Sequence, residues 1–600
     1  MEKWFVAAKK ADFDGWAAKF RISPVLARII RNRDITTEEE VRRFLYGTLE
    51  DCHSPWKLLD MEKAVTILGE EIRKGTAIRV IGDYDVDGIC SAYILTKGLT
   101  LLGANVDTAI PHRIHDGYGL NEHLIREAAQ DGIGLIVTCD NGIAAADQIR
   151  LANELGIRVI VTDHHEVPYE LKDGKRTQIL PPAAAVIDPK QEGDTYPFPG
   201  ICGGVVAYKV MQALVQQEAA DAGEEKRISS ERVQRLREGM EEFLEFAALS
   251  TVCDVMELKD ENRILVKEGL KRLRKTVNPG LKALMEVCGI EPEMLSAYHL
   301  GFVLGPCLNA TGRLDTAERA LELLRSREHN AALIAARELK DLNESRKNLT
   351  AQGVKEAEEF LQKENMLEDK VYVIYLPGLH ESLAGIVAGK IKEAHHHPVF
   401  VLTLGEEGVK GSGRSVEEYH MYEALTGIND LLTRFGGHKM AAGVSMEECK
   451  IDQFRRRLNE NCKLSDEDFV QKIHIDVPMP MAYVTDDFAD QMELLEPFGV
   501  GNPKPLFAER KLIFSEAKPI GKNRQYTKFR VLLPDGESRQ MVYFGNTEKF
   551  CDYIDETLGK GTSDSLFAGR IRVPLNVVYQ IGKNTFQGRT EIQYLLQYYC

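Results

Sequence analysis

The stretch Ala77-Ile-Arg-Val-Ile-Gly-Asp-Tyr-Asp-Val-Asp-Gly88 decides the fold, because it joins an apolar run directly to three carboxylates within five residues. Ala77–Gly82 predicts a strand, and Ile89–Leu95 predicts the start of a helix. A strand, a polar loop and a helix in this order are typical of open α/β sheets, which bind ligands at the carboxyl ends of their strands. Because the carboxylates repel one another, the loop calls for a positive partner such as a divalent metal ion.

Two other interpretations of this loop are a calcium-binding loop and a polar turn. Asp-x-Asp-x-Asp-Gly also begins an EF-hand calcium loop, but that loop needs a bidentate Glu at its twelfth position, and counting from Asp83 places Ile94 there. Calcium binding of that type is therefore excluded. A polar turn whose aspartates cap the following helix stays open when the loop is considered alone.

Length and composition limit the class of protein. A chain of 600 residues with 44% hydrophobic residues is enough for about three to five domains. No membrane span and no signal peptide are expected, because long uncharged apolar runs are missing from the sequence. The 11 cysteines include no Cys-x-x-Cys pair, which favours reduced thiols in the cytoplasm over a zinc module.

Charge is distributed unevenly along the chain. The net charge of −16 disfavours nucleic acid as a partner when taken alone, but a sum over the chain hides local faces. Residues 504–530 contain eight Lys and Arg against two Glu, a local charge of +6. With Phe514, Tyr526 and Phe529 available for stacking, this segment is a candidate for guiding a single strand, and a solvated strand surface is the alternative.

Strand-like and helical patterns alternate between residues 58 and 210, which predicts a mostly parallel sheet with helices on both faces. The expected strands are Ile78–Ile81, Asn105–Ile110, Leu135–Thr138, Val159–Thr162 and Ala184–Ile187. A long polar helix over 330–366 leads to a second α/β unit with strands at Val371–Tyr375 and Val399–Leu404. From about 465 onward, short strands and turns predict a small barrel of all-β character.

Further acidic motifs follow the other strands. Asp140-Asn141-Gly142 and Asp163-His164-His165-Glu166 each come after an apolar strand, and Asp254 lies in a later segment. Because the carboxyl ends of parallel strands line one edge, we expect the strand-end side chains to converge. Carboxylate and imidazole ligands suit Mn²⁺ or Mg²⁺ better than zinc.

The number of carboxylates predicts two ions. Asp85, Asp87, Asp140 and Asp254 carry four negative charges, which two divalent ions would cancel. Two such ions about 3.5–4 Å apart form a clamp for in-line attack at phosphorus.

These motifs resemble, in order, those of the DHH phosphoesterases, and the rest of the chain is similar to the RecJ-type single-strand-specific exonucleases. The additional matching motifs are Gly305–Arg313, Gly411–Ser415, Phe435–Gly443 and Glu496–Pro503. The resemblance implies an α/β fold with a parallel-sheet DHH domain, a long connecting helix, a second α/β DHH-associated domain and a C-terminal all-β OB-type domain. The expected boundaries are 1–57 for an N-terminal segment packing on the first core domain, 58–329 for the DHH domain, 330–366 for the helix, 367–463 for the DHH-associated domain and 464–600 for the OB-type domain.

The resemblance also implies roles for individual residues. The implied metal ligands are Asp85, Asp87, Asp140, His164 and Asp254. Asp83 is assigned to catalysis beside the metals, and His165 is expected to point away from His164, as an acid or charge stabiliser at the scissile phosphate. The implied substrate-binding residues are Arg113, Asn309, Arg313, Ser412, Arg414, Gly436, Gly437 and His438.

The implied function is a metal-dependent exonuclease that hydrolyses single-stranded DNA from 5′ to 3′ to mononucleotides, in DNA repair and recombination, with two Mn²⁺ or Mg²⁺ ions. A helicase and a single-strand-binding protein are candidate partners. The alternatives are a DHH phosphodiesterase acting on short oligonucleotides or cyclic dinucleotides and an inactive replication scaffold of the same fold. The C-terminal domain argues against the first, and the intact acidic and histidine set argues against the second.

Two departures from the family pattern bear on substrate contacts. Cys307 stands where the family often has a basic residue, and Leu379-His380-Glu381-Ser382-Leu383 replaces a turn that contains Trp and Gly.

Overall fold

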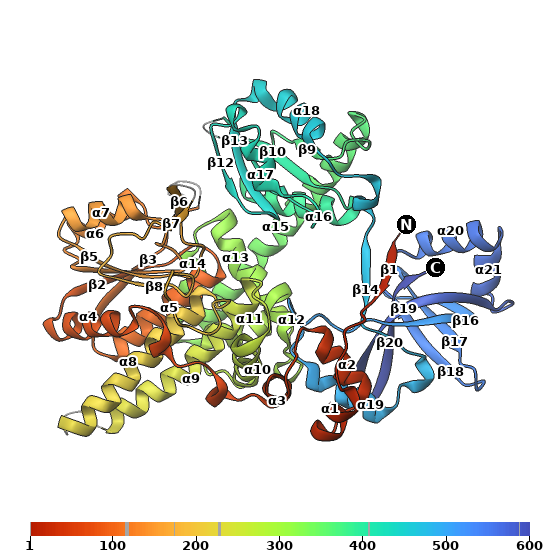
Figure 1. The fold of residues 1–600 in the computed structure, drawn as a ribbon, viewed down its shortest axis with the longest axis horizontal. Coiled ribbons are helices and arrows are strands. Elements are labelled where there is room, and N and C mark those ends of the chain that lie inside the picture. Colours follow the sequence, from red (N-terminus) through yellow and green to blue (C-terminus); the bar gives the residue numbers. More distant parts are fainter. Residues whose placement is uncertain (1, 114–118, 173–174, 226–229, 406–407, 587–588) are drawn as a thin grey trace. The chain divides into compact units, whose positions relative to one another are not determined.

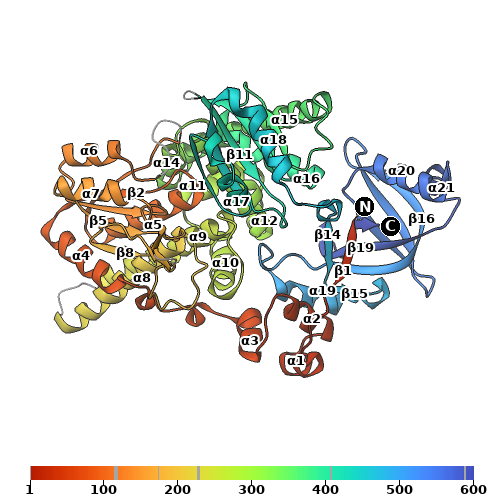
Figure 2. The same cartoon turned by 45° about the horizontal axis from the view of Figure 1, so that its top comes forward.

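The computed structural model describes the chain except for residues 1, 114–118, 173–174, 226–229, 406–407 and 587–588. The chain divides into two compact units (Figures 1 and 2). The first contains residues 53–256 and 265–471, and the second contains 2–52, 257–264 and 472–600.

The first unit is built around a parallel sheet with the strand order β3-β2-β4-β5-β8. Its strands are β2 (Ala77–Ile81), β3 (Asn105–Ala109), β4 (Leu135–Cys139), β5 (Arg158–Thr162) and β8 (Ala185–Ile187). They confirm the predicted strands, with no end shifted by more than one residue. The chain leaves β2 toward β3 on one side and leaves β4 toward β5 on the other. This reversal opens a crevice at the carboxyl ends of β2 and β4, the usual ligand position in such sheets.

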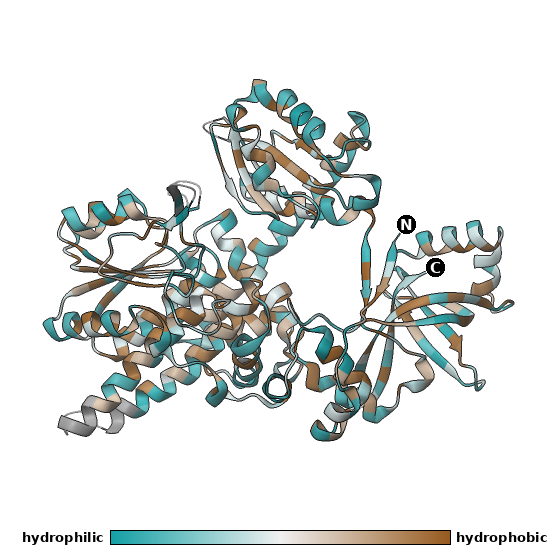
Figure 3. Cartoon of the chain, in the orientation of Figure 1, coloured by the Kyte–Doolittle hydropathy of each residue, from teal (hydrophilic) through white to brown (hydrophobic). Residues whose placement is uncertain are grey.

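Helices cover both faces of this sheet (Figure 1). On one face, α6 (Glu122–Gln130) and α7 (Ala146–Glu154) contribute apolar side chains to a core shared with β4 and β5. On the other, α5 (Val86–Leu101) is buried between the sheet and the antiparallel helices α8 (Gly203–Glu225) and α9 (Ser230–Cys253). Figure 3 shows the same division, with apolar strands inside and largely polar outer helices.

Helices connect the first sheet to a second one. They are α10 (Asp260–Leu273), α11 (Pro279–Cys288), α12 (Ala297–His299), α13 (Gly305–Leu314), α14 (Glu318–Arg325) and the long α15 (His329–Lys363). The helix α4 (Met61–Lys74) precedes β2 and packs against α8 and β8. α15 confirms the predicted connecting helix. The second sheet has the order β12-β13-β11-β10-β9, and α16 (Ala384–His395), α17 (Met421–Thr426) and α18 (Ile451–Asn461) accompany it. Its strands are β9 (Tyr372–Tyr375), β10 (Val399–Gly405), β11 (Gly408–Arg414), β12 (Arg434–Gly437) and β13 (Ala441–Met446).

The second unit is a barrel closed by pairing of β16 with both β17 and β19. Its strands are β15 (Val477–Pro478), β16 (Phe507–Ile520), β17 (Tyr526–Leu532), β18 (Ser538–Tyr543), β19 (Val573–Phe586) and β20 (Arg589–Tyr599). Helices α19 (Asp486–Met492), α20 (Thr547–Leu558) and α21 (Thr562–Phe567) interrupt the strands. The barrel is thus less purely β than predicted, and its longest strands have 14 residues.

One prediction about this unit was wrong. Phe514 and Phe529 cannot stack on a nucleic acid, because they are 0% and 1% exposed. Phe514 lies in β16 and Phe529 in β17, and alternate residues of each barrel strand point inward, so an aromatic ring in a basic strand can belong to the core. Residues 2–52, which were predicted to pack on the first core domain, belong to the second unit and share a core with the barrel through α1 (Phe13–Phe20), α2 (Pro24–Asn32) and α3 (Glu38–Tyr46). Amphipathic periodicity shows which face of a helix is buried but not what covers it.

None of the helices in the described part of the chain combines the length and apolar character needed to span a bilayer. All 11 cysteines are free thiols.

Candidate metal centre and substrate pocket

The loop after β2 is both a helix cap and part of an acidic site. The Asp85 carboxylate accepts hydrogen bonds from the backbone N–H groups of Asp87 and Gly88, at 2.9 and 3.1 Å, and so caps α5. The capping interpretation was therefore correct, and it is compatible with a metal site. Gly88 permits the close turn, since a Cβ there would lie 2.4 Å from the Asp83 backbone.

Asp87 is fixed by groups that the sequence analysis missed. Its two carboxylate oxygens each accept a backbone N–H, from Gly203 and Gly204, at 2.7 Å, and it also accepts the Ser250 hydroxyl. These glycines begin α8, whose N-terminus favours negative charge. The Gly203-Gly204 pair was the available signal, because only small residues let the backbone approach a carboxylate this closely.

Asp140, after β4, has a φ of 61°, which is uncommon for a non-glycine residue and is typical of functional sites. The neighbouring Asn141 side chain donates to the carbonyls of Ile81 and Cys139, at 3.1 and 2.9 Å. These bonds tie the ends of β2 and β4 together and hold Asp140 at the crevice.

His164 brings the motifs of the different elements together. Its Nε2 lies 3.0 Å from Asp140 Oδ1, 3.4 Å from Asp87 Oδ2 and 3.7 Å from Asp254 Oδ2. We use the name acidic cluster for Asp83, Asp85, Asp87, Asp140, His164 and Asp254. Two of its subsets, Asp87–His164–Asp254 and Asp83–Asp85–Asp140, each place their ligand atoms within 4.8 Å of one another. The convergence predicted from the strand ends is confirmed.

The electrostatics of the acidic cluster favour a cation. Burial and the charge of Asp87 raise the pKa of Asp254 to about 8. Burial, together with neighbouring carboxylates, also raises the pKa of Asp83, Asp85 and Asp140. Four acids are thus held where their charged forms are disfavoured, and positive charge placed among them would reverse that.

The donor set fits divalent ions. The cluster offers carboxylate oxygens and one imidazole nitrogen, which is the combination that suits Mn²⁺ and Mg²⁺. Within the described chain, Asp83 Oδ1 is buried without a hydrogen-bond partner, which leaves a carboxylate oxygen available in the cluster. The two ligand groups share no residue, and each offers three donor atoms to a cation.

His165 lies beside the cluster and is oriented by Asp163. Its Nδ1 is 2.7 Å from Asp163 Oδ1 and 3.9 Å from Asp140 Oδ1, and its side chain is 44% exposed. Burial lowers the pKa of His165, but the hydrogen bond and charge of Asp163 outweigh it and raise the pKa to about 9. Asp163 in turn accepts backbone N–H groups from Ile143 and His164, at 2.9 and 2.8 Å. The sequence analysis gave Asp163 no role, although it begins the histidine motif.

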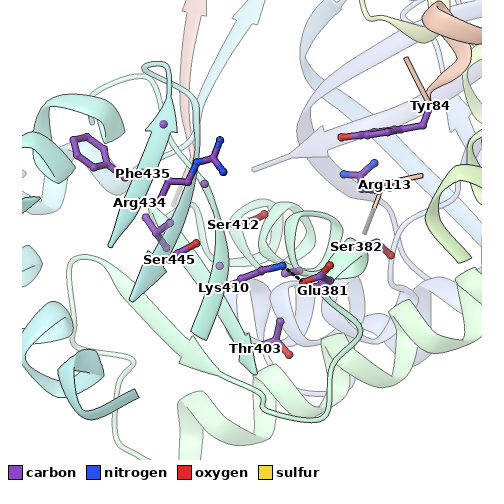
Figure 4. Close-up of a pocket in the computed structure, with 15 residues that line it drawn as sticks. Tyr84, Arg113, Glu381, Ser382, Thr403, Lys410, Ser412, Arg434, Phe435 and Ser445 are labelled. Carbon is purple, nitrogen blue, oxygen red and sulfur yellow. Dashed lines mark ion pairs between the residues drawn. The ribbon is translucent and has the colours of Figure 1, made fainter. Parts of the chain in front are cut away.

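A cavity of about 480 Å³ in the first unit is bordered by Tyr84 and Arg113 on one side and by the second sheet on the other (Figure 4). Arg113 lies over the Tyr84 ring, 4.6 Å from its centroid. Ser412 and Gly436 line the sheet side, so three of the predicted substrate-binding residues meet in one pocket. Lys410 and Arg434 also line it and were not predicted.

Arginines near this pocket are not neutralised by acids. Among the described residues, Arg113, Arg313 and Arg414 form no ion pair with a carboxylate, although Arg313 donates to the Ser382 carbonyl at 2.9 Å. Burial lowers the pKa of Arg414, and the charge of Arg113 lowers it further. Burial and the charge of Arg113 likewise lower the pKa of Arg313 to about 10. Arginines that repel one another and lack acidic partners are suited to bind phosphates.

Three other predicted residues lie outside the pocket lining. Asn309 Oδ1 accepts the Val86 N–H at 3.1 Å, which holds the acidic loop to α13. Gly437 has a φ of 141°, and a Cβ there would lie 2.4 Å from the Ala441 carbonyl, so its backbone requires glycine. His438 is exposed, and its N–H donates to Ala441. Substrate contacts by these residues stay predictions.

Three parts of the chain match models of known protein families: the region of the first sheet, the region of the second sheet and the barrel. Residues 77–236 match the DHH family N-terminal domain, residues 368–464 match the DHHA1 domain and residues 475–598 match the RecJ OB domain.

Individual relatives cover most of the chain. It is 37% identical over 506 residues to the single-stranded-DNA-specific exonuclease RecJ of Salmonella typhimurium, covering 82% of this chain and 84% of that protein. With the protein of the same name from Bacillus subtilis the identity is 34% over 86% of this chain, which spans only 62% of that relative. The crystal structure of RecJ in complex with Mn²⁺ from Thermus thermophilus superimposes with a TM-score of 0.79 at 27% identity, covering 100% of this chain and 79% of that one. The chain belongs to the RecJ family of DHH-domain proteins.

Proposed function

We propose that this chain is a metal-dependent exonuclease that hydrolyses single-stranded DNA from 5′ to 3′ to mononucleotides, in DNA repair and recombination. The observation that carries the proposal is the acidic cluster at the crevice between β2 and β4, in which each of two ligand groups places its donor atoms within 4.8 Å of one another. The relatives named single-stranded-DNA-specific exonucleases support the substrate and the reaction.

The acidic cluster would hold two Mn²⁺ or Mg²⁺ ions through Asp85, Asp87, Asp140, His164 and Asp254. Bound there, such ions supply positive charge to the scissile phosphate and make water a nucleophile at neutral pH. The chain's own contribution is rigidity, because Asp87 and Asp140 are fixed through backbone hydrogen bonds and strand ends. Asp83, 2% exposed, either completes this ligand set or orients it.

His165 would act on the phosphate as a cation or proton donor. A pKa of about 9 keeps its ring protonated at neutral pH, and Asp163 fixes the Nδ1 side. We place the Nε2 of this half-exposed ring against a phosphate oxygen beside the cluster.

The substrate would be held by Arg113, Arg313 and Arg414 together with Ser412 and Gly436. Arginine guanidinium groups bind phosphates through paired N–H groups, and the small residues Ser412 and Gly436 let the DNA strand approach the second sheet. Asn309 would act through the acidic loop, and Gly437 and His438 through the turn after β12.

A helicase and a single-strand-binding protein are the proposed partners, because single strands arise by unwinding. The cytoplasm is the proposed location, in keeping with 11 free cysteines.

Digestion of a 5′-labelled single strand, a duplex and a dinucleotide, with and without Mn²⁺, tests the proposal. We expect mononucleotide release from the single strand that depends on Mn²⁺, is abolished by Asp85→Ala and is slowed by about 10²-fold or more by His165→Ala. Equal release from the duplex would contradict strand specificity. Cleavage of the dinucleotide alone would favour a small-substrate phosphodiesterase, and no release by wild type would favour an inactive scaffold.

A further inference from the structure

The pocket beside the acidic cluster contains one carboxylate, and its position is unexpected. Among the described residues that line the pocket, the charged ones are Arg113, Lys410, Arg434 and Glu381. Three cations suit an anionic ligand, whereas a carboxylate opposes it. Glu381 Oε2 lies 3.0 Å from Lys410 Nζ, and Figure 4 shows this ion pair within the pocket.

Strand register explains how Lys410 and Arg434 reach one face of the second sheet. Lys410 on β11 is opposite Ser445 on β13, and Ser445 is opposite Arg434 on β12. The next row on the same face contains Ser412, Gly443 and Gly436. We call these six residues the β11 face. The row with the two cations lies beside the row of the small residues Ser412, Gly443 and Gly436. These small side chains leave room for a ligand at the sheet.

Glu381 is held in place by its short turn. The Thr403 hydroxyl on β10 donates to the Leu379 carbonyl, and Arg313 donates to the Ser382 carbonyl at 2.9 Å. The carboxylate is thus presented from a segment anchored on both sides, and its side chain is only 24% exposed. An ion pair of this kind is not a loose surface contact.

The charge of Glu381 affects ligands of different charge unequally. A terminal phosphate carries about −1.5 to −2 charges at neutral pH, whereas a terminal hydroxyl carries none. A carboxylate in the pocket repels the first and also takes up part of the charge of Lys410. Its effect on a hydroxyl end is small by comparison.

Tyr84 lines this pocket and lies between the cluster residues Asp83 and Asp85 in the sequence, so the pocket adjoins the cluster. In the proposed function, this pocket holds the terminal nucleotide that is released when the scissile phosphate at the cluster is attacked. We propose that Glu381 determines end specificity, pairing with Lys410 to limit the preference of the pocket for a 5′-phosphorylated strand over a 5′-hydroxyl strand. Lys410 is the group through which the preference is set. This inference rests on the proposed function and assigns a residue that lies where the chain departs from its family pattern.

The test compares Glu381→Gln with wild type on one single-stranded oligonucleotide prepared with a 5′-phosphate or a 5′-hydroxyl. The readout is kcat/KM for the 5′-phosphate strand divided by kcat/KM for the 5′-hydroxyl strand, at saturating Mn²⁺. General effects on folding or metal loading cancel in this ratio. We expect the ratio to rise by about five- to tenfold in Glu381→Gln, the size of one partly screened charge. We expect it to fall in Lys410→Gln.

Glu358→Gln is the matched control, because Glu358 also forms an ion pair, with His395 at 3.0 Å, but does not line the pocket. Its ratio should equal that of wild type. An unchanged or lower ratio in Glu381→Gln, with normal cleavage of both strands, would overturn the inference and leave the proposed function intact. Failure of wild type to cleave either strand would overturn both.

Discussion

The acidic cluster and the β11 face occupy neighbouring parts of the first unit and are constructed in opposite ways. The cluster consists of short side chains that are mostly buried and held by backbone N–H groups and strand ends. The β11 face carries its charge on long side chains above glycine and serine, and Gly436 and Arg434 are exposed. Rigid, mutually repelling carboxylates can hold metal geometry, whereas long cationic side chains can follow a moving strand. Substitutions in the cluster should therefore abolish turnover, and those on the β11 face should alter affinity.

The largest effect is expected for Asp140→Asn. Its kcat should fall by roughly 10³-fold or more, because Asp140 belongs to one ligand group and its Oδ1 lies 3.0 Å from His164 Nε2 of the other. Its metal-free form should also be more stable than wild type, since a buried carboxylate with a raised pKa is removed. Single-turnover cleavage and thermal unfolding in a chelator measure the two. Full activity would contradict the role of the cluster.

His165→Ala should reduce kcat by about 10²–10⁴-fold, and Asp163→Asn by about 10–100-fold. Removing the Asp163 charge lowers the pKa of His165, so the protonated ring is lost at lower pH than in wild type. The rate of Asp163→Asn relative to wild type should thus be lower at pH 8 than at pH 6. A pH–rate profile measures this, and parallel profiles would argue that His165 acts without its proton.

Arg414→Gln tests the neighbourhood of the β11 face, because Arg414 follows Ser412 by two residues on β11 and so lies on the same side of that strand. KM for single-stranded DNA should rise by about 10- to 100-fold with a smaller change in kcat, because a charge-assisted hydrogen bond to phosphate is lost. Arg457→Gln is a matched control, since Arg457 lies on α18 and forms an ion pair with Asp430 at 2.6 Å, whereas Arg414 lies on β11. A fall in kcat at constant KM would instead place Arg414 with the catalytic groups.

Alanine substitutions at the adjacent Gly436 and Gly437 distinguish a steric effect on the pocket from an effect on the backbone conformation. At Gly436 a Cβ meets nothing within 4 Å, so Gly436→Ala should fold normally and raise KM by a few fold by occupying the pocket. Gly437→Ala should lose about 1 kcal/mol or more of unfolding free energy, because its φ of 141° disfavours a side chain. Denaturant unfolding and steady-state kinetics distinguish the two. Equal destabilisation would mean that the first glycine is also needed for the backbone.

The smallest effect concerns stability without metal. The pKa of Asp254 is raised from an ordinary value of 3.8 to about 8, so its protonated form stabilises the fold at low pH. That contribution is lost as pH rises through about 8. The Tm in a chelator should fall by roughly a few degrees between pH 5 and pH 8, less so in Asp254→Asn. An identical slope in both proteins would contradict the raised pKa.

Periodicity located the strands and the acidic motifs that follow them, because a buried parallel strand is a continuous apolar run and its carboxyl end has a fixed position in the sheet. The acidic cluster was predictable for that reason. Gly203, Gly204 and Ser250 were not, since they reach Asp87 from segments more than a hundred residues away.

The β11 face was only partly predictable. Glycine-rich motifs indicated Ser412, Arg414 and Gly436, but the alignment of Lys410 with Arg434 depends on strand register. The barrel shows a further limit of prediction from sequence. The aromatic residues Phe514 and Phe529 of two basic strands lie in the barrel core, and the N-terminal helices pack against the same core. Composition does not reveal either choice.

Calorimetric titration of the metal-free protein with Mn²⁺ tests the central claim most directly. The acidic cluster predicts two bound ions per chain in wild type, and weakened binding with a reduced stoichiometry in Asp140→Asn, while Arg414→Gln keeps the wild-type isotherm. No binding, or binding of the same stoichiometry and affinity in Asp140→Asn, would contradict a two-metal site at the ends of β2 and β4.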